Sequence, residues 1–234
     1  MNGYNCIVCI KQVPDTKQVT GAAMKEDGTI NRAALPAIFN PEDLNALEQA
    51  LRLKDQNPGS TITIVTMGPP RATDVIREAL YRGADDGVLL TDRAFAGADT
   101  LATSYALSMA IRKLGSCDLI IGGRQAIDGD TAQVGPQVAE KLGLNQITYV
   151  NEINECDGKE ITVTRHIDGG IEVVKAPLPI MLTVNGDAAP CRPPCRNPCR
   201  SSCRNRCRSP RPRGRPGCRA SRGCCATRWP RRAR

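Results

Sequence analysis

The last 44 residues of the chain, 191–234, lack acidic side chains and every large aliphatic residue. They contain no Asp or Glu and no Leu, Ile, Val, Phe or Met, but 15 Arg and 8 Cys. A segment without such apolar side chains cannot build a hydrophobic core of its own. We therefore expect a domain over residues 1–190 and a low-complexity tail over residues 191–234 that is disordered.

The body of the chain lacks the basic excess of a nucleic-acid-binding protein. The whole chain has a net charge of +8, of which the tail carries +15 and residues 1–190 carry −7. Because residues 1–190 have a net negative charge, we do not expect them to bind the phosphates of DNA or RNA. The tail could neutralise phosphates nonspecifically, but its arginines do not alternate with aromatic residues, so nucleic-acid binding is the minor alternative. Its cysteines recur at every fourth position from Cys191 to Cys207, a spacing without the CxxC pairs of zinc sites.

Long apolar runs are also missing. No stretch approaches the roughly 18 uncharged apolar residues of a membrane span, and no basic segment followed by an apolar core begins the chain. We expect a cytoplasmic protein with reduced cysteines. Cys6 and Cys9 have CxxC spacing, but they lie in a predicted strand, where residues three apart point to opposite faces. His166 is the only histidine, and we expect it on a strand surface rather than in catalysis.

Short β-rich runs alternate with helical periodicity through the first 153 residues. Asn40 and Pro41 predict a helix start, Asp99 predicts another, and Gly83 predicts a helix end. Strands separated by helices imply parallel βαβ crossovers, so the fold class is α/β with a doubly wound, mostly parallel sheet. The predicted strands are 5–13, 61–67, 87–92, 117–123 and 146–153, and the helices are 40–55, 72–83, 101–115 and 131–143.

The pattern changes after residue 153. Two alternating runs flank the turn sequence DGG at 168–170, which predicts an appended β-hairpin. The run PIMLTVN at 179–185 predicts a last strand that could return to the main sheet. Residues 14–39 are predicted to be a loop with a small hairpin around Thr29 and Ile30.

The polar stretch RQAIDGDTAQVGP, 124–136, follows a predicted buried strand and leads into a helix. Open parallel sheets bind ligands beyond the carboxyl ends of their strands, and a helix start offers free N–H groups to a phosphate. Gly129 and Gly135 would allow close backbone approach. Asp128 and Asp130 are negative, so we interpret them as caps and turn residues, and a loop that merely caps a helix is the alternative. Neither GxGxxG nor GxxxxGK[ST] occurs in the chain.

Several long motifs resemble the small (beta) subunit of electron transfer flavoproteins over nearly all of residues 3–187. The residues that carry the resemblance are KQVPDT, NPEDLNALEQALRLKD, VTMGPP, RGADDGVLLTDRAFAGADTLATS, GRQAIDGDTAQVGP and VTRHIDGGIEVVKAPLPIMLT. The resemblance implies a Rossmann-like fold of the adenine nucleotide alpha hydrolase-like type. It also implies a heterodimer with a large (alpha) subunit that carries the electron-transferring FAD.

The same resemblance implies an adenine nucleotide in the small subunit. The versions AGADTLATS and RQAIDGDTAQVGP look like the branch of anaerobes, in which this nucleotide is a second FAD that accepts hydride from NADH; AMP is the alternative. Implied partners are dehydrogenases such as acyl-CoA dehydrogenase, and NADH with ferredoxin or flavodoxin. A non-redox adenine-nucleotide-binding module is the alternative function. No catalytic residue and no metal ligand are expected, since flavin chemistry belongs to the cofactor.

Carried over residue by residue, the resemblance places Cys9 beside the adenine, Asn40 and Asp43 near the base or ribose, and Met67 at the end of the second strand. Asp99, Thr100 and residues 123–135 would line the phosphates and the flavin. The complete predicted set of nucleotide contacts is Cys9, Asn40, Asp43, Met67, Gly68, Asp99, Thr100, Gly123, Arg124, Gln125, Ala126, Ile127, Asp128, Gly129, Asp130, Thr131, Ala132, Gln133, Val134 and Gly135.

The family resemblance stops near Pro190. Arg, Pro, Ala, Gly, Cys, Ser and Trp are the residues that a GC-rich gene yields when it is read out of frame, and they dominate the tail. We therefore hypothesise a frameshift, either natural or in the sequence data, that removed the family's partner-binding C-terminal parts. An intact mass that matched this tail in the protein from its source would refute the hypothesis.

Overall fold

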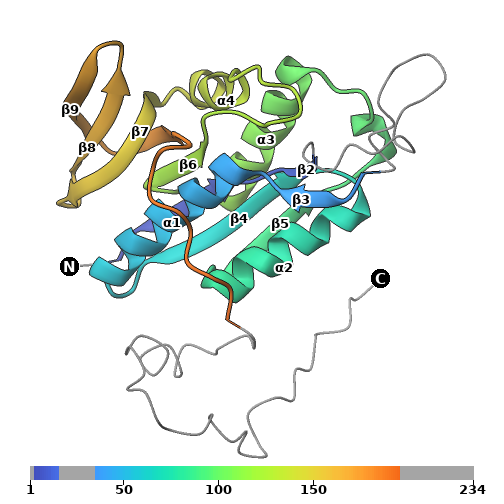
Figure 1. Cartoon of the computed structure of the whole chain (residues 1–234), viewed down its shortest axis with the longest axis horizontal. Helices are drawn as coiled ribbons and strands as arrows, with labels where there is room; N and C mark the ends of the chain where they lie inside the picture. Colours follow the sequence, from blue (N-terminus) through green and yellow to red (C-terminus); the bar gives the residue numbers. More distant parts are fainter. Residues whose placement is uncertain (1–2, 16–34, 196–234) are drawn as a thin grey trace, which may run out of the picture. The chain divides into compact units, whose positions relative to one another are not determined.

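Parallel strands alternate with helices in the computed structural model, which describes residues 3–15 and 35–195 (Figure 1). The strands are β1 Asn5–Cys9, β2 Gln12–Pro14, β3 Ala37–Phe39, β4 Thr61–Met67, β5 Asp86–Leu90, β6 Leu119–Gly123, β7 Asn145–Cys156, β8 Glu160–Ile167, β9 Gly170–Pro177 and β10 Ile180–Val184. The α-helices are α1 Pro41–Gln56, α2 Thr73–Arg82, α3 Thr100–Leu114 and α4 Val134–Leu142, with short 3₁₀ turns at Pro70–Ala72 and Arg93–Phe95.

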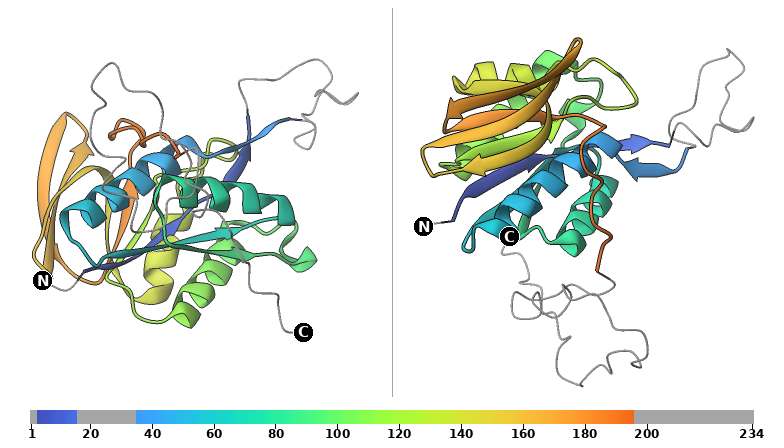
Figure 2. Two further views of the ribbon diagram at one scale, coloured as in Figure 1. Left: turned by 90° about the horizontal axis from the view of Figure 1, so that it is seen from below. Right: turned by 60° about the vertical axis from the view of Figure 1, so that its left-hand side comes forward.

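The main sheet has the strand order β5-β4-β1-β6-β10-β7-β8-β9. Its first six strands pair in parallel, and β7, β8 and β9 pair antiparallel. The predicted α/β class with a doubly wound, mostly parallel sheet is confirmed. The last predicted strand, β10, does return to the sheet, where it lies between β6 and β7. Figure 2 shows β8 and β9 continuing the sheet beyond β7.

Two apolar clusters cover the two faces of the sheet. One cluster joins α1 and α2 to the face that includes Cys6, Ile64 and Leu182. The other joins α3 and α4 to the opposite face, and Cys9 packs against it. Cys6 and Cys9 therefore face opposite sides of β1, as the strand periodicity predicts.

Several local predictions need correction. The predicted first strand ends early, because residues 12–14 form β2 and pair with β3. Helix α4 begins at Val134, three residues later than predicted, because Asp130 and Ala132 adopt positive φ angles of 48° and 53°. Asn40 precedes α1, but its side chain does not cap the helix. The predicted end at Gly83 is confirmed by its φ of 126°.

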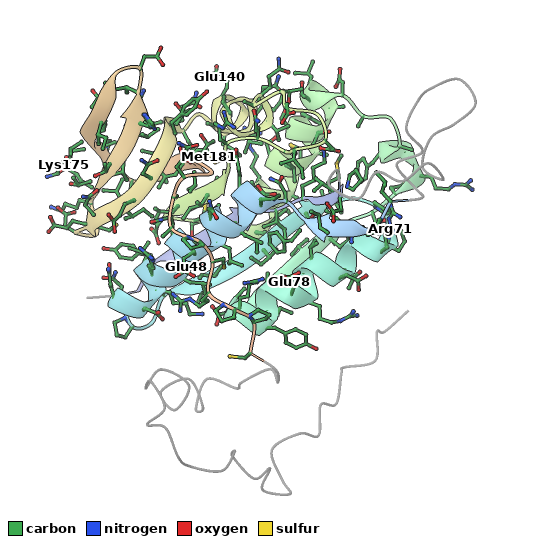
Figure 3. All side chains as sticks on the ribbon, viewed as in Figure 1. Glu48, Arg71, Glu78, Glu140, Lys175 and Met181 are labelled. Atoms are coloured by element: carbon green, nitrogen blue, oxygen red, sulfur yellow. The ribbon has the colours of Figure 1, made fainter. Side chains whose placement is uncertain are left out.

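The segment after β10 runs across α1, as the orange chain in Figures 1 and 3 shows near Glu48. Arg192 bonds both carboxylate oxygens of Glu48, at 2.9 Å each, and contacts Asp55 at 2.8 Å. Burial alone would raise the pKa of Glu48, which is 5% exposed, but the hydrogen bonds and charge of Arg192 hold it below its usual value. The Cys195 amide donates to the Tyr81 carbonyl at 2.9 Å, so the first tail residues have defined contacts with the domain.

The small hairpin predicted around Thr29 and Ile30 and the tail beyond residue 195 lie outside the described residues. The domain boundary at residue 190 stays a prediction. Among the helices of the described ranges, none combines the length and apolar character that crossing a membrane requires.

Candidate functional site

The carboxyl ends of the central parallel strands form one edge of the sheet. Cys9 ends β1 beside Val65 of β4 and Gly122 of β6, and Gly123 ends β6 beside Val184 of β10. Residues 124–133 leave this edge as an irregular loop before α4 begins. This edge is where open parallel sheets bind their ligands.

Two polar side chains at the start of α1 hold the loop. The Asn40 amide, which is fully buried, donates to the Gln125 carbonyl at 2.9 Å and accepts from the Ile127 amide at 3.2 Å. The Asp43 carboxylate accepts from the Gly123 amide at 3.0 Å and from the Lys11 amide at 2.7 Å. Both residues belong to the predicted site, and the structure gives their polar atoms protein partners. Their direct contact with a nucleotide stays a prediction.

Desolvation dominates the electrostatics of Asp43. Burial raises the pKa of its carboxyl to about 7, although the hydrogen bonds from Asn40, Lys11 and Gly123 act in the opposite direction. Burial likewise raises the pKa of the Cys9 thiol to about 12. Cys9 is therefore a neutral packing group at the end of β1 rather than a thiolate nucleophile.

Glu42, which sequence reasoning did not single out, is a third buried polar residue in this turn, at 8% exposed. Its carboxylate accepts from Arg124 Nη2 at 2.7 Å and from the Gln125 amide at 3.0 Å. The Arg124 guanidinium also lies over the Tyr149 ring, with 5.5 Å between Cζ and the ring centroid. An acid in the first turn is an ordinary helix feature, so the sequence carries no signal for these tertiary contacts.

The two aspartates of the loop also have partners. Asp128 pairs with the Lys11 ammonium at 2.7 Å, and Asp130 accepts from the Gln125 side chain at 2.9 Å. Neither aspartate caps α4, whose N-cap position is Gln133, so the interpretation of Asp128 and Asp130 as helix caps is wrong. Asp128 lies in the turn formed by residues 127–129, which confirms its interpretation as a turn residue. Asp130 directly follows this turn, where its amide donates to the Ala126 carbonyl at 2.9 Å, and it has a positive φ, as Asp tolerates.

The starts of α3 and α4 are joined by side chains. Asp99 caps α3 by accepting from the Ala102 amide at 2.7 Å, as predicted. The Thr100 hydroxyl donates to Gln133 Oε1 at 2.9 Å and accepts from Gln137 at 3.4 Å. Gln137 Oε1 is buried and has no hydrogen-bond partner within the described residues. The starts of α3 and α4 thus lie together beside the loop, and helix starts are places where anions bind in proteins.

The predicted residues fall into two groups around the edge. Cys9 and Met67 pack on the α3 and α4 side of the sheet, whereas Asn40 and Asp43 lie at the start of α1 on the other side. The loop spans the edge between the two sides of the sheet, since it bonds the start of α1 at one end and Thr100 of α3 at the other. The remaining predicted residues are Gly68, which follows β4, and residues 123–135, which leave β6, form the loop and begin α4.

The glycines of this stretch differ in their surroundings. A Cβ on Gly135 would lie 2.6 Å from the Thr183 side chain, so its close approach is to β10. A Cβ on Gly129 would meet no atom within 4 Å, which leaves the backbone there open. Of Gly129 and Gly135, only Gly129 therefore has space beside its backbone for a ligand.

The fold is an α/β domain in which the polar loop of residues 124–133 lies at the carboxyl edge of a mostly parallel sheet. A family model for the electron transfer flavoprotein domain matches residues 27–202. The chain belongs to the electron transfer flavoprotein family.

Curated relatives with similar sequences include proteins that are named as subunits of electron transfer flavoproteins or of reductase complexes. The chain is 52% identical over 179 residues to "Electron transfer flavoprotein subunit beta" of Clostridium acetobutylicum, covering 76% of this chain and 67% of the relative. It is 51% identical over 177 residues to "Caffeyl-CoA reductase-Etf complex subunit CarD" of Acetobacterium woodii, covering 76% and 66%. It is 50% identical over 184 residues to "Acryloyl-CoA reductase electron transfer subunit gamma" of Anaerotignum propionicum, covering 78% and 67%. The chain thus spans about two thirds of the length of these relatives.

Proposed function

We propose that this chain is the small subunit of a heterodimeric electron transfer flavoprotein and binds an adenine nucleotide at the carboxyl edge of its sheet. Family membership and the beta-type relatives support the subunit assignment. The observation that carries the binding site is the loop of residues 124–133, which is bonded to the start of α1 and lies beside the starts of α3 and α4.

The residues at this edge fit the phosphates of a nucleotide. Helix N-termini present unbonded N–H groups and a partial positive charge, and the loop charges on Arg124, Asp128 and Asp130 already have protein partners. Thr131 and Gln133 add neutral donors, and Gln137 has an unsatisfied buried oxygen that a ligand hydroxyl could satisfy. The neutral Cys9 and Met67 provide an apolar wall suited to a base.

We assign FAD to this site, with AMP as the alternative. When bound, FAD supplies the electron-transfer chemistry, and the protein supplies binding, orientation and exclusion of water. The subunit would pass electrons between NADH or dehydrogenases and other carriers such as ferredoxin or flavodoxin, in complex with the large subunit. The relatives named for caffeyl-CoA and acryloyl-CoA reductase support a CoA-ester dehydrogenase, such as an acyl-CoA dehydrogenase, as a partner. The cytoplasmic location stays a prediction.

Nucleotide analysis of the heterodimer tests this proposal. The chain is co-expressed with a large subunit, and the purified complex is denatured to release its nucleotides for chromatography. Two FAD per heterodimer support FAD in the small subunit, and one FAD with one AMP supports the alternative. A chain that purifies alone with bound nucleotide but no flavin would instead favour a non-redox adenine-nucleotide module. A complex whose only nucleotide is one FAD contradicts the proposed site.

A further inference from the structure

Glu42, Arg124 and Tyr149 form a cluster at the point where the loop leaves β6, and we call these three residues the Arg124 clamp. The Glu42 carboxylate contacts Arg124 Nη2 at 2.7 Å, Arg124 Nε at 3.4 Å and the Gln125 amide at 3.0 Å. Glu42 comes from α1, more than 80 residues earlier in the chain. A carboxylate as buried as that of Glu42, whose side chain is 10% exposed, needs such donors around it to offset the cost of its burial.

The other side of Arg124 is held by β7 and β10. Its guanidinium lies over the Tyr149 ring, at a distance that favours cation–π attraction. Tyr149 has a φ of 58°, a costly conformation for an aromatic residue, and lies at the register irregularity between β7 and β10, where its side chain is exposed. The Arg124 amide donates to the Val184 carbonyl at 2.8 Å. Backbone, guanidinium edge and guanidinium face are therefore all fixed by the protein.

This arrangement decides what the Arg124 charge can do. Arg124 is the only basic residue among residues 124–133, so it would be the obvious ligand for a phosphate. Its side chain is 26% exposed and is paired with a Glu42 carboxylate whose own exposure is 10%. If the Arg124 guanidinium left Glu42 to bind a ligand, it would leave a buried carboxylate without a compensating charge, which is strongly unfavourable.

We propose that Glu42 is a positioning residue of the nucleotide site: through Arg124 and the Gln125 amide it presets the loop, and Arg124 acts as a structural cation rather than as a phosphate ligand. This proposal rests on the proposed function of the edge as a nucleotide site. It replaces the expected direct role of Arg124 by a role in holding residues 125–133 in the binding conformation.

The test uses the co-expressed heterodimer, stripped of nucleotide and titrated with AMP and with FAD. In Glu42→Gln the Gln side chain keeps one acceptor but loses the charge that holds Arg124. We expect nucleotide affinity at least tenfold weaker than in the unchanged protein. If Arg124 were a phosphate ligand, the same change would free its guanidinium, and affinity would stay the same or rise.

Glu48→Gln is the matched control. Glu48 lies on the same helix, is 5% exposed and also pairs with an arginine at two oxygens, but it faces Arg192 instead of the loop. We expect it to lower the melting temperature as much as Glu42→Gln does, with nucleotide affinity unchanged. Equal affinity losses in both variants would overturn the proposal, because general destabilisation would then explain them.

Arg124 variants separate geometry from charge. Lys keeps the charge but cannot reproduce the planar, two-pronged contact of Arg. A positioning role predicts that Arg124→Lys binds nucleotide as weakly as Arg124→Met, and that adding Glu42→Gln to Arg124→Met weakens binding no further. Near-normal affinity in Arg124→Lys contradicts the proposal.

Tyr149 offers a milder variant if the charged changes prevent folding. Tyr149→Leu removes the ring beneath Arg124, whereas Tyr149→Phe keeps it, so only the former should weaken nucleotide binding severalfold. Equal affinity in the two variants contradicts a role for the clamp. If the unchanged heterodimer bound neither AMP nor FAD in its small subunit, the proposed function itself would fail, which is a different result from normal binding in Glu42→Gln.

Discussion

Three buried polar residues at the start of α1 serve the loop rather than their own helix. Asn40, Glu42 and Asp43 all bond the segment 123–127, which lies about 80 residues further along the chain. Their local pattern predicted the helix start correctly, because Pro41 and first-turn acids favour one. It could not predict the partners, since helix caps and tertiary hydrogen bonds use the same side-chain oxygens.

Asp43 makes stability depend on pH in an unusual direction. Burial raises its pKa from an ordinary 3.8 to about 7, so the folded protein holds this proton more tightly than the unfolded chain does. Protonated Asp43 therefore contributes stability that is full below about pH 4 and is lost as the pH rises towards 7. Relative to Asp43→Asn, the unchanged protein should lose about 1.4 kcal/mol of unfolding free energy per pH unit across that window. Urea unfolding of both proteins between pH 5 and 8 measures this, and parallel pH profiles would contradict it.

Arg192 should stabilise the domain although it belongs to the Arg- and Cys-rich tail, whose composition differs from that of residues 1–190. Without it, the Glu48 carboxylate would stay buried without its main cation. Because Arg192 itself is about a third exposed, we expect Arg192→Ala to lower the free energy of unfolding by about 2 kcal/mol, less than for a fully buried pair. Urea unfolding measures the loss, and adding Glu48→Gln should restore part of it by removing the stranded charge. An unchanged midpoint would show that this residue does not dock in solution.

At the scale of elements, the end of β6 packs unusually closely against the start of α1. A Cβ on Gly123 would lie 2.4 Å from Asp43 Oδ1 and 2.8 Å from the Glu42 carbonyl carbon. Only glycine allows this approach, and the approach is what lets both acids reach the loop. The strand end and the helix start therefore form one unit of the candidate site.

We expect Gly123→Ala to lower stability by about 2 to 3 kcal/mol, because backbone atoms cannot yield as a flexible side chain can. It should also abolish nucleotide retention by the heterodimer. Gly129→Ala is the control: its added methyl meets no atom within 4 Å, so stability should change by less than about 0.5 kcal/mol. Thermal melts and nucleotide analysis of both variants check this, and equal melting temperatures would argue against the close β6–α1 contact.

The elements themselves were largely predictable from the sequence. Hydrophobic periodicity placed β4 at its observed bounds, Thr61–Met67, and the Asp99 cap placed α3 to within a residue. The later start of α4 was not predictable, since it depends on positive φ angles at Asp130 and Ala132 in a loop held by distant contacts. The contact of Tyr149 with Arg124 was not predictable either. The sequence around Tyr149 has the pattern of an ordinary strand and carries no signal for its positive φ or for this contact.

At the scale of the whole molecule, the parallel α/β class followed from the order of strands and helices, but the strand order did not. Sequence neighbours usually pair in space, and β7 pairs with β8 and β8 with β9 as that rule predicts. The insertion of β10 between β6 and β7 breaks it, because Ile180, Met181 and Leu182 are fully apolar and need cover on both faces. Several matching motifs identified the family more firmly than the physical pattern of any one loop did.

The central place of β10 also sets an order of events during synthesis. β6 has one edge paired to β1, and its other edge has no partner until residues 180–184 have left the ribosome. Until then β6 is an edge strand of the sheet β5-β4-β1-β6, and its open, apolar edge is of the kind to which other chains can pair. Pairings this distant in sequence also form slowly. We therefore expect chains that end before residue 184 to aggregate. Completion of β10 removes this risk, because β10 pairs with the open edge of β6.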